Sequence, residues 1–283
     1  MSRITRVGIL GSGIMGAGLA EVAARAGYQV VVRSRSMDAA NEMLTTIDKG
    51  FVRAIERGKS TDEERTRVLA LISATDQLND LAECDLVIES VIEDLTVKLA
   101  LFAELDRVVK AGAILATNTS TLPVIELAKA TQRPDLVCGI HFFNPAPLMT
   151  LVEVVRPLTA SDETIANAIE FATQCGKDVV ETKDHAGFVV NALLFPYLNN
   201  AVRMLERGTA PMESIDIAMK GGCNFPMGPF ALLDLVGLDT SVAILDALHR
   251  QFGDAHYDAA PTLRKMVADG HLGRKSKRGF YTY

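Results

Sequence analysis

The chain has 283 residues, of which 48% are hydrophobic and 23% charged, a balance typical of a globular protein with one large or two ordinary domains. Its net charge of −6 leaves no excess of cations to displace counterions, which argues against nucleic acid as a partner. No apolar run reaches the roughly 18 residues that span a bilayer, so we expect no membrane partner and a cytoplasmic location. The four cysteines form no CxxC motif or Cys/His cluster, so we expect buried free thiols and no metal site.

In chain order, the first 183 residues alternate short apolar runs with helical stretches. The expected strands are Val7–Leu10, Gln29–Val32, Leu86–Ser90, Ala113–Ala116, Leu136–Ile140, Leu151–Val155 and Asp178–Glu181. The first five are continuous apolar runs, as expected for strands that are covered on both faces. The pattern predicts an α/β domain over residues 1–183, built from βαβ units around a mostly parallel sheet.

After residue 183 the strand-like runs end and helical patterns continue to the last residue. The stretch "GFVVNALLFPYLNNAVRMLERG" predicts a long helix that continues through Pro196, and "GGCNFPMGPF" predicts a break between helices. We therefore expect an all-helical second domain over residues 184–283. Roughly 100 residues form a modest core alone, so this domain is expected to bury further apolar surface, including surface against a second subunit.

A glycine-rich turn follows the first expected strand. In "RVGILGSGIMGAGLAEVAARAG" the residues Gly11, Gly13 and Gly16 form the pattern G-x-G-x-x-G, with Ser12, Ile14 and Met15 between them. The motif lies between a strand and a helix, which is the context of a Rossmann dinucleotide-binding turn. The first glycine permits the tight turn, the second admits the pyrophosphate, and the third lets the helix pack closely on the strand. We expect a dinucleotide on the N-terminus of this helix.

Two polar residues stand out in the later apolar strands. His141 ends the run "LVCGIH", beyond which open α/β sheets hold their ligands, and Glu153 interrupts "LVEVV". Each alone has an ordinary structural interpretation. Together they fit a general base and the carboxylate that orients it, and the residues alone leave the two interpretations equally open.

The motifs "ATNTSTL", "CGIHFFNPAPLMTLVEVV", "GFVVNALLFPYLNNAVRMLERG", "PMGPFALLDLVGLDT" and "GRKSKRGFYTY" resemble the 3-hydroxyacyl-CoA dehydrogenase family over nearly the whole chain. The resemblance is greatest to its short bacterial members, the 3-hydroxybutyryl-CoA dehydrogenases. It implies reversible hydride transfer between a nicotinamide cofactor and a short-chain 3-hydroxyacyl-CoA, with the second domain closing on the substrate and forming a homodimer.

The resemblance also implies roles for single residues. His141 matches the catalytic histidine and Glu153 its acidic partner, while Ser120 and Asn191 match residues that contact substrate and complete the site. An imidazole suits both directions of such a reaction because it titrates near neutral pH. The positions expected to line the nicotinamide half of the cofactor pocket are Glu93, Lys98, Asn118, Ser120 and Asn144. Asn118 and Asn144 also fit a purely loop-bracing role.

Three cations, Lys49, Arg53 and Arg57, repeat at i, i+4 and i+8 on the helix after the second strand. Such a row is usually a solvated helix face. The resemblance implies that it binds the phosphorylated end of CoA, although Gly50 stands where relatives have a serine contact.

The second strand ends in "RSRS" where many relatives have an aspartate on the adenine ribose. Ser34 removes the charge that would repel a 2′-phosphate, and Arg35 offers a cation suited to one. We therefore expect NADP(H) to be favoured over NAD(H), with a solvated loop that tolerates NAD(H) as the alternative. Two other functions stay open at this point: a β-hydroxyacid dehydrogenase that uses a catalytic lysine, and a non-catalytic crystallin-like relative.

Overall fold

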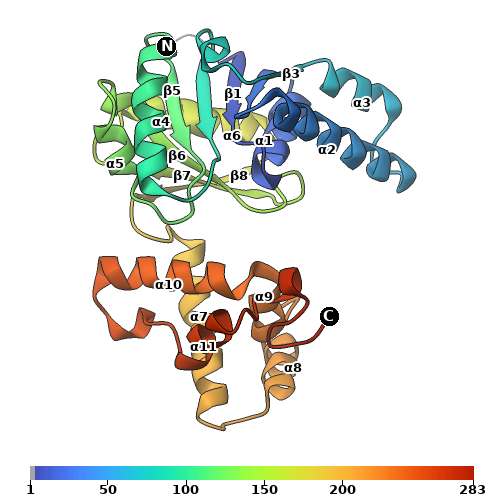
Figure 1. Cartoon of the computed structure of the whole chain (residues 1–283), viewed down its shortest axis with the longest axis vertical. Coiled ribbons are helices and arrows are strands. Elements are labelled where there is room, and N and C mark those ends of the chain that lie inside the picture. The colour runs from blue at the N-terminus through green and yellow to red at the C-terminus, as the bar shows by residue number, and fades with distance from the viewer. Residues whose placement is uncertain (1–3) are drawn as a thin grey trace. The chain divides into compact units, whose positions relative to one another are not determined.

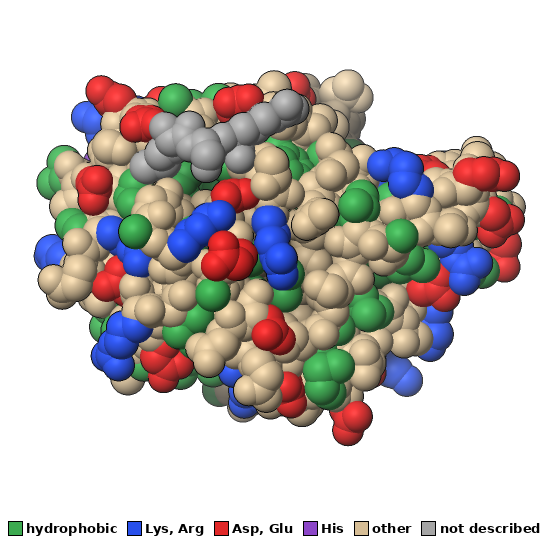
Figure 2. Space-filling model, turned by 90° about the horizontal axis from the view of Figure 1, so that it is seen from above, with side chains coloured by type: hydrophobic (Ala, Val, Ile, Leu, Met, Phe, Trp, Pro, Cys, Tyr) green, Lys and Arg blue, Asp and Glu red, His purple; other side chains and the backbone are tan. Residues whose placement is uncertain are grey.

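The computed structural model describes residues 4–283, which form two compact units: the first ends at Asp184 and the second is His185–Tyr283. The sequence placed the boundary after Lys183. Within residues 4–283 no helix is long and apolar enough to cross a bilayer. On the face of the molecule seen in Figure 2, acidic and basic side chains are interspersed and neither sign forms a continuous patch.

The first unit contains one sheet and the helices that cover it (Figure 1). The described strands are β1 Arg6–Leu10, β2 Gln29–Arg33, β3 Ile72–Thr75, β4 Leu86–Glu89, β5 Ile114–Thr117, β6 Val137–Phe142, β7 Leu151–Arg156 and β8 Asp178–Lys183. Its helices are α1 Ile14–Arg25, α2 Met37–Glu56, α3 Asp62–Leu69, α4 Leu95–Val108, α5 Val124–Lys129 and α6 Asp162–Gln174, with 3-10 turns at Leu78–Leu81 and Pro134–Leu136.

The strand order is β3-β2-β1-β4-β5-β6-β7-β8, and every neighbouring pair is parallel except β6 and β7. The expected Rossmann-type, mostly parallel sheet is thus confirmed. The order reverses between β1 and β4, and ligands of open α/β sheets bind at such a switch point. The strand β3 was not predicted; it is a short edge strand in which the polar residues Ser73 and Thr75 prevent a continuous apolar run.

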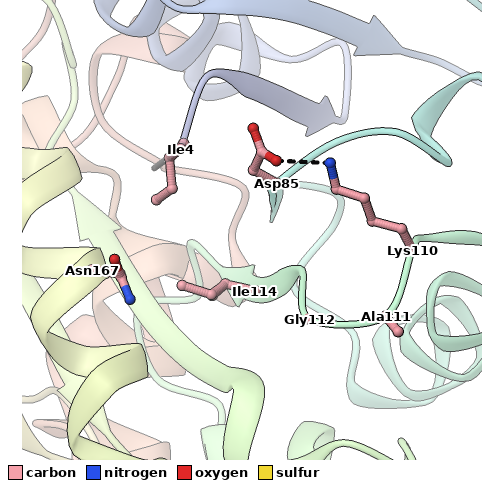
Figure 3. Close-up of a pocket in the computed structure, with 7 residues that line it drawn as sticks. All are labelled: Ile4, Asp85, Lys110, Ala111, Gly112, Ile114 and Asn167. Atoms are coloured by element: carbon pink, nitrogen blue, oxygen red, sulfur yellow. Dashed lines mark ion pairs between the residues drawn. The ribbon is translucent and has the colours of Figure 1, made fainter. Parts of the chain in front are cut away.

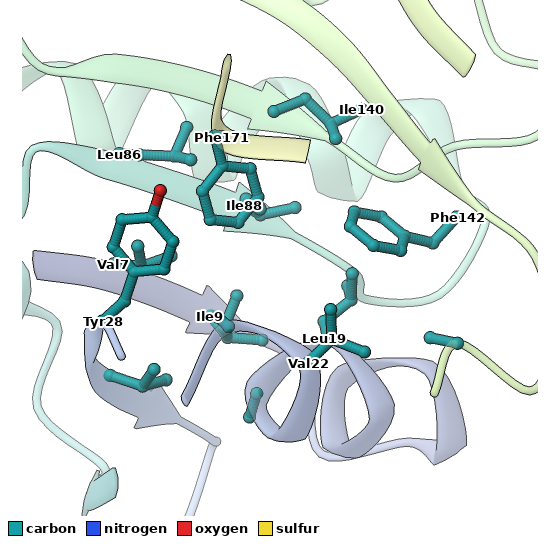
Figure 4. Close-up of a cluster of buried hydrophobic side chains, with 14 of the residues drawn as sticks. Val7, Ile9, Leu19, Val22, Tyr28, Leu86, Ile88, Ile140, Phe142 and Phe171 are labelled. Carbon is teal, nitrogen blue, oxygen red and sulfur yellow. The ribbon is translucent and has the colours of Figure 1, made fainter. Parts of the chain in front are cut away.

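The main core lies between the sheet and helices α1, α2 and α6. Alternate strand residues such as Val7, Ile9, Leu86, Ile88 and Ile140 point into it, together with Leu19 of α1 and Phe171 of α6 (Figure 4). Because successive side chains of a strand point to opposite faces, the residues between these face α4 and α5 instead. That second face carries Glu89, Thr117, His141 and Glu153.

The second unit is helical, as expected. Its helices are α7 Val190–Glu206, α8 Met212–Cys223, α9 Pro229–Val236, α10 Leu238–Phe252 and α11 Pro261–Ala268, with 3-10 turns at Ala255–Tyr257 and Arg274–Ser276. Helix α7 continues through Pro196, as predicted. Two buried aspartates fasten the last residues: Asp234 accepts the N–H groups of Phe280 and Tyr281, both at 2.8 Å, and Asp216 accepts the Tyr281 hydroxyl at 3.0 Å.

The cysteines are free but not all buried. Cys84 and Cys138 are buried, and burial raises the pKa of Cys84 to about 11 and of Cys138 to about 12. Cys175 is half-buried and Cys223 is exposed, so the expectation of buried thiols is wrong for Cys223, which lies at the C-terminal end of a surface helix.

Candidate active site

The reversal of direction between β6 and β7 places His141 directly opposite Glu153. The two residues are paired in the antiparallel register, and Gly139 pairs with Val155 on the same face. Directly opposed residues of an antiparallel pair have neighbouring side chains, so the ladder itself brings the two groups together. Both are buried: His141 is 3% exposed and Glu153 is fully inaccessible.

Three side chains form a hydrogen-bonded series along this face. Nδ1 of His141 lies 2.8 Å from Oε2 of Glu153, and Nε2 lies 3.1 Å from Oγ of Ser120. Ser120 lies in the loop after β5, at the carboxyl end of the sheet. In this order the residues offer a hydroxyl, an imidazole and a carboxylate. Such a series can transfer a proton, because the imidazole acts as a base and the carboxylate orients it.

The loop around Ser120 is held by two neighbours that the sequence had placed at the cofactor. Glu93 accepts the N–H of Ser120 at 3.0 Å through Oε1. The amide oxygen of Asn118 accepts the N–H of Phe142 at 2.8 Å, which ties the loop to the strand that carries His141. Asn144 is exposed in the loop after β6, directly before Pro145.

Lys98, also expected to line the cofactor pocket, is buried and paired with carboxylates. It is 1% exposed, and its Nζ contacts Glu89 at 2.7 Å and Glu93 at 3.2 Å. Glu89, at the end of β4, also accepts the hydroxyl of Thr117 at 2.8 Å. Sequence reasoning missed Glu89; a carboxylate inside the apolar run "LVIES" was a signal that could have found it.

The glycine turn has the shape that a dinucleotide needs. A Cβ at Gly16 would lie 1.9 Å from the carbonyl oxygen of Gly11. A Cβ at Gly11 would lie 2.2 Å from the carbonyl oxygen of Ser90, and the φ angle of Gly11 is +112°, which side-chain-bearing residues rarely adopt. These two glycines are therefore required by the fold itself. A Cβ at Gly13 would meet nothing within 4 Å, so the open space there is available to a ligand at the N-terminus of α1. The turn, including Ser12, Ile14 and Met15, fits a dinucleotide pyrophosphate.

The end of β2 lies beside this turn. The hydroxyl of Ser34, a residue only 5% exposed, donates to the Ser12 hydroxyl at 3.0 Å. Ser36 caps α2 by accepting the N–H of Ala39, while Arg33 donates to the carbonyl oxygen of Asp76. Arg35 is exposed and has no ion-pair partner among residues 4–283.

The three cations of the expected CoA site are separate from the catalytic series. Lys49 and Arg53 are exposed on α2, and Arg57 is exposed at its C-terminal cap. Ala40, Met43, Ile47 and Phe51 form the buried side of the same helix. Asn191 belongs to the second unit, in the first turn of α7, where it is 8% exposed.

A cavity of about 170 Å³ lies elsewhere in the first unit (Figure 3). It lies near Ile4, Asp85 and Ile114, which precede or begin parallel strands, so it lies at the amino ends of the strands. Lys110 pairs with Asp85 at its edge, at 2.8 Å. The cavity is therefore at the opposite end of the sheet from Ser120, and it contains none of the candidate catalytic residues.

Comparison with known proteins identifies the family to which the chain belongs. Residues 6–185 match the model of the 3-hydroxyacyl-CoA dehydrogenase NAD binding domain, and residues 187–283 match that of the 3-hydroxyacyl-CoA dehydrogenase C-terminal domain. The chain belongs to the 3-hydroxyacyl-CoA dehydrogenase family. The match to the NAD binding domain supports a nicotinamide cofactor. The family resemblance seen in the sequence motifs is confirmed.

Relatives within the 3-hydroxyacyl-CoA dehydrogenase family align end to end. A 3-hydroxybutyryl-CoA dehydrogenase of Mycobacterium tuberculosis is 50% identical over 286 positions, which covers 99% of both chains. One of Bradyrhizobium diazoefficiens is 44% identical and covers 99% of this chain and 96% of its own. The crystal structure of (S)-3-hydroxybutyryl-CoA dehydrogenase from Ralstonia eutropha superposes with a TM-score of 0.96 at 41% identity, covering 99% of each chain.

Proposed function

We propose that this 3-hydroxyacyl-CoA dehydrogenase interconverts (S)-3-hydroxybutyryl-CoA and acetoacetyl-CoA reversibly with NAD(P)(H). The observation that carries the proposal is the Ser120–His141–Glu153 series, set at the carboxyl ends of a sheet whose glycine turn fits a dinucleotide. The relatives named 3-hydroxybutyryl-CoA dehydrogenase support the short acyl chain, because they match over nearly their whole length.

His141 is the proposed general acid and base. In the oxidising direction its Nε2 takes the proton of the substrate 3-hydroxyl, and Glu153 stabilises the imidazolium through the bond to Nδ1. In the reducing direction the imidazolium returns this proton to the substrate oxygen. Ser120, already within hydrogen-bond distance of Nε2, orients the same oxygen. The nicotinamide, when bound, accepts or supplies the hydride at substrate C3.

The two alternative functions are not favoured. A β-hydroxyacid dehydrogenase of the lysine-dependent kind needs a lysine that reaches substrate. Lys98, which is linked to Ser120 only through Glu93, is 1% exposed and paired with two carboxylates. A non-catalytic, crystallin-like role has no need of a buried His–Glu pair that is hydrogen-bonded to a serine. Taking ionisable groups out of water costs free energy even when they are paired, and a purely structural role does not require that cost here.

NADP(H) is the proposed preferred cofactor. The position at the end of β2 carries Ser34 and thus no carboxylate to repel a 2′-phosphate. Next to it are the exposed guanidinium of Arg35 and the N-terminus of α2, and both favour a bound anion. Ser36 is used as the cap of α2 and Arg33 is turned toward Asp76, so Arg35 is the residue expected to reach the phosphate.

The acyl-CoA substrate is proposed to place its phosphorylated end on Lys49, Arg53 and Arg57. All three are exposed, and no ion pair involves them in the described part of the chain. Cations that are not paired within the protein remain available to phosphate groups.

The helical unit is the proposed dimerisation domain, with Asn191 as its contribution to the active site. It exposes several large apolar side chains: Leu193 at 72%, Ile217 at 67%, Leu235 at 49% and Phe225 at 42%. Exposed apolar side chains such as these are the kind of surface that a second subunit would cover. Sedimentation of the purified protein tests the homodimer.

The four free thiols support a cytoplasmic location, since disulfides form in oxidising compartments.

The proposed function is tested by reduction of acetoacetyl-CoA, measured with NADH and NADPH side by side. Turnover is expected with both, with a higher kcat/KM for NADPH. Absence of turnover with either cofactor would overturn the function. A preference for NADH would overturn only the assignment of cofactor. Oxidation of (S)- and (R)-3-hydroxybutyryl-CoA in parallel tests the stereochemistry.

A further inference from the structure

A fully buried ion pair lies under the catalytic loop, and the proposed chemistry does not use it. Glu89 at the end of β4 is inaccessible, and Lys98 of α4 is 1% exposed. Nζ of Lys98 lies 2.7 Å from Oε1 and 2.9 Å from Oε2 of Glu89. Taking both charges out of water is costly, so such a pair is weak evidence for stability and points to a role in fixing positions.

The first link from this pair to the active site passes through β5. Glu89 and Thr117 are partners in the parallel register of β4 and β5. Oε2 of Glu89 accepts the Thr117 hydroxyl at 2.8 Å, and that hydroxyl oxygen in turn accepts the N–H of Thr119 at 3.2 Å. The carboxylate therefore orients the hydroxyl that holds the backbone one residue before Ser120.

The second link passes through Lys98 and Glu93. Nζ of Lys98 lies 3.2 Å from Oε2 of Glu93, whose side chain is 41% exposed. Oε1 of Glu93 accepts the Thr119 hydroxyl at 2.5 Å and the N–H of Ser120 at 3.0 Å. A half-exposed glutamate would sample several rotamers, and the buried ammonium group restricts it to the one that reaches the loop.

Both links end on the two residues that place the serine hydroxyl. We propose that Glu89 is a positioning residue: through Thr117 and Lys98 it fixes the backbone at Thr119 and Ser120, so that Ser120 Oγ lies 3.1 Å from His141 Nε2. This inference rests on the proposed function. Misplacement of a catalytic group by about 1 Å lowers rates by about 100-fold, so the effect of losing Glu89 falls on turnover.

The test compares Glu89→Gln, Thr117→Val and Thr117→Ser in the full-length protein. Thr117→Val removes the bridging hydroxyl with little change of shape, whereas Thr117→Ser keeps it. We expect Glu89→Gln to lower kcat for acetoacetyl-CoA reduction by about 10- to 100-fold and Thr117→Val by about 10-fold, with both KM values within about threefold of wild type. Thr117→Ser is expected to retain nearly full turnover.

Asp106→Asn is the matched control for stability. Asp106 lies on the same helix, α4, and pairs with Arg133 at 2.8 Å, but no hydrogen bond links it to Ser120. It should lower the melting temperature without lowering kcat per folded molecule. The inference is overturned if Thr117→Val turns over as fast as Thr117→Ser, or if Glu89→Gln loses activity only in proportion to its folded fraction.

A wild-type protein without turnover would refute the proposed function, and a second measurement then tests the inference by itself. Amide hydrogen exchange at Thr119 and Ser120 reports the same hydrogen bonds without any substrate. Thr117→Val is expected to speed exchange at Thr119 by about tenfold or more relative to Thr117→Ser, while amides of α6 stay unchanged. Equal exchange in the two variants would overturn the positioning role.

Discussion

His141 and Glu153 face each other across the only antiparallel pairing among the described strands, with Nδ1 and Oε2 2.8 Å apart. The carboxylate of Glu153 engages Nδ1, and the hydroxyl of Ser120 engages Nε2. The orientation of the ring is therefore fixed from both sides: by the serine on one edge and the glutamate on the other.

Replacing His141, the proposed base, should remove turnover while leaving cofactor binding intact. We expect His141→Gln to lower kcat by roughly 10³-fold and Glu153→Gln by roughly 10²-fold, because general acid–base catalysis contributes about 10²- to 10⁴-fold. Titration of cofactor fluorescence checks that affinity is retained. His256→Gln, an exposed histidine of the second unit, is the control and should behave as wild type. A His141→Gln variant that keeps most of its activity would refute the assignment.

The glycine turn separates a folding role from a binding role. Gly16→Ala should destabilise the first unit severely, because its Cβ would lie 1.9 Å from the carbonyl oxygen of Gly11. Gly13→Ala meets no protein atom within 4 Å, so it should melt near the wild-type temperature yet bind NADPH at least about tenfold more weakly. Thermal melts and cofactor titration measure the two effects. Undiminished binding by Gly13→Ala would place the pyrophosphate elsewhere.

Substitutions at the end of β2 should change the preference for NADPH over NADH. Ser34→Asp combined with Arg35→Ala restores a carboxylate for the ribose and removes the cation, so kcat/KM should shift toward NADH by at least about 100-fold as a ratio. Rates with both cofactors at limiting concentration give this ratio. Arg33→Ala is the comparison, because its guanidinium already contacts the Asp76 carbonyl, and a much smaller shift is expected.

Reversing charge on α2 should affect the acyl-CoA substrate selectively. Arg53→Glu with Arg57→Glu is expected to raise the KM for acetoacetyl-CoA by about tenfold or more, since each lost phosphate contact is charge-assisted. The KM for NADPH should stay within about twofold. Arg107→Glu, an exposed cation on α4, serves as the control. Equal increases in both KM values, or none, would remove α2 from the CoA site.

Asp85 should give the first unit a pH-dependent stability. Burial raises the pKa of Asp85, but hydrogen bonds from Lys110 and from the N–H groups of Arg6 and Thr5 outweigh this and lower it from 3.8 to about 2. A carboxyl with a depressed folded pKa stabilises the fold above its unfolded pKa, and this stability is lost as the pH falls toward the folded pKa. Asp85→Asn should therefore cost about 2 kcal/mol at neutral pH.

The loss of unfolding free energy caused by Asp85→Asn should shrink as the pH falls from about 4 toward 2, because the wild-type carboxyl takes up its proton in this interval. Urea unfolding followed at neutral pH and at several points in that interval measures the difference. Lys110→Met should show a smaller loss, because the two backbone donors to Asp85 remain. A cost that is independent of pH would mean that Asp85 acts through packing alone.

Most of the fold was predictable from the sequence because most of its strands are continuous apolar runs and its glycine turn lies between strand and helix. The edge strand β3 was missed because "ISAT" has no continuous apolar run and alternates over only four residues, too few to distinguish a strand from a loop. The direction of β7 was readable in principle: eight residues separate it from β6, too few for the crossover that a parallel pair requires.

The site was predictable in part, and for a different reason. Residues matched to family motifs, such as Ser120, His141 and Glu153, were named from the sequence, and the structure brings these three together. The pairing of Glu89 with Lys98 was not readable, because nine positions separate a strand end from a helix and only their packing makes them neighbours. Lys98 was expected to line the cofactor pocket, and the two carboxylates that the structure places beside it were not foreseen.

The antiparallel ladder between β6 and β7 has a consequence for how such an enzyme can change. The spacing of His141 and Glu153 is set by strand register, and a slip of one residue would turn either side chain to the opposite face of the sheet. The connecting loop, residues 143–150, lies outside the ladder and exposes Leu148 and Met149. Phe143 packs on the ring of His141, with the two centroids 4.6 Å apart, and Ala146 is buried in the main core, so only the exposed positions such as Leu148 and Met149 can vary without moving the His141–Glu153 pair. Substitutions at these exposed loop positions are therefore expected to leave the His141–Glu153 spacing unchanged, because strand register and core packing hold it.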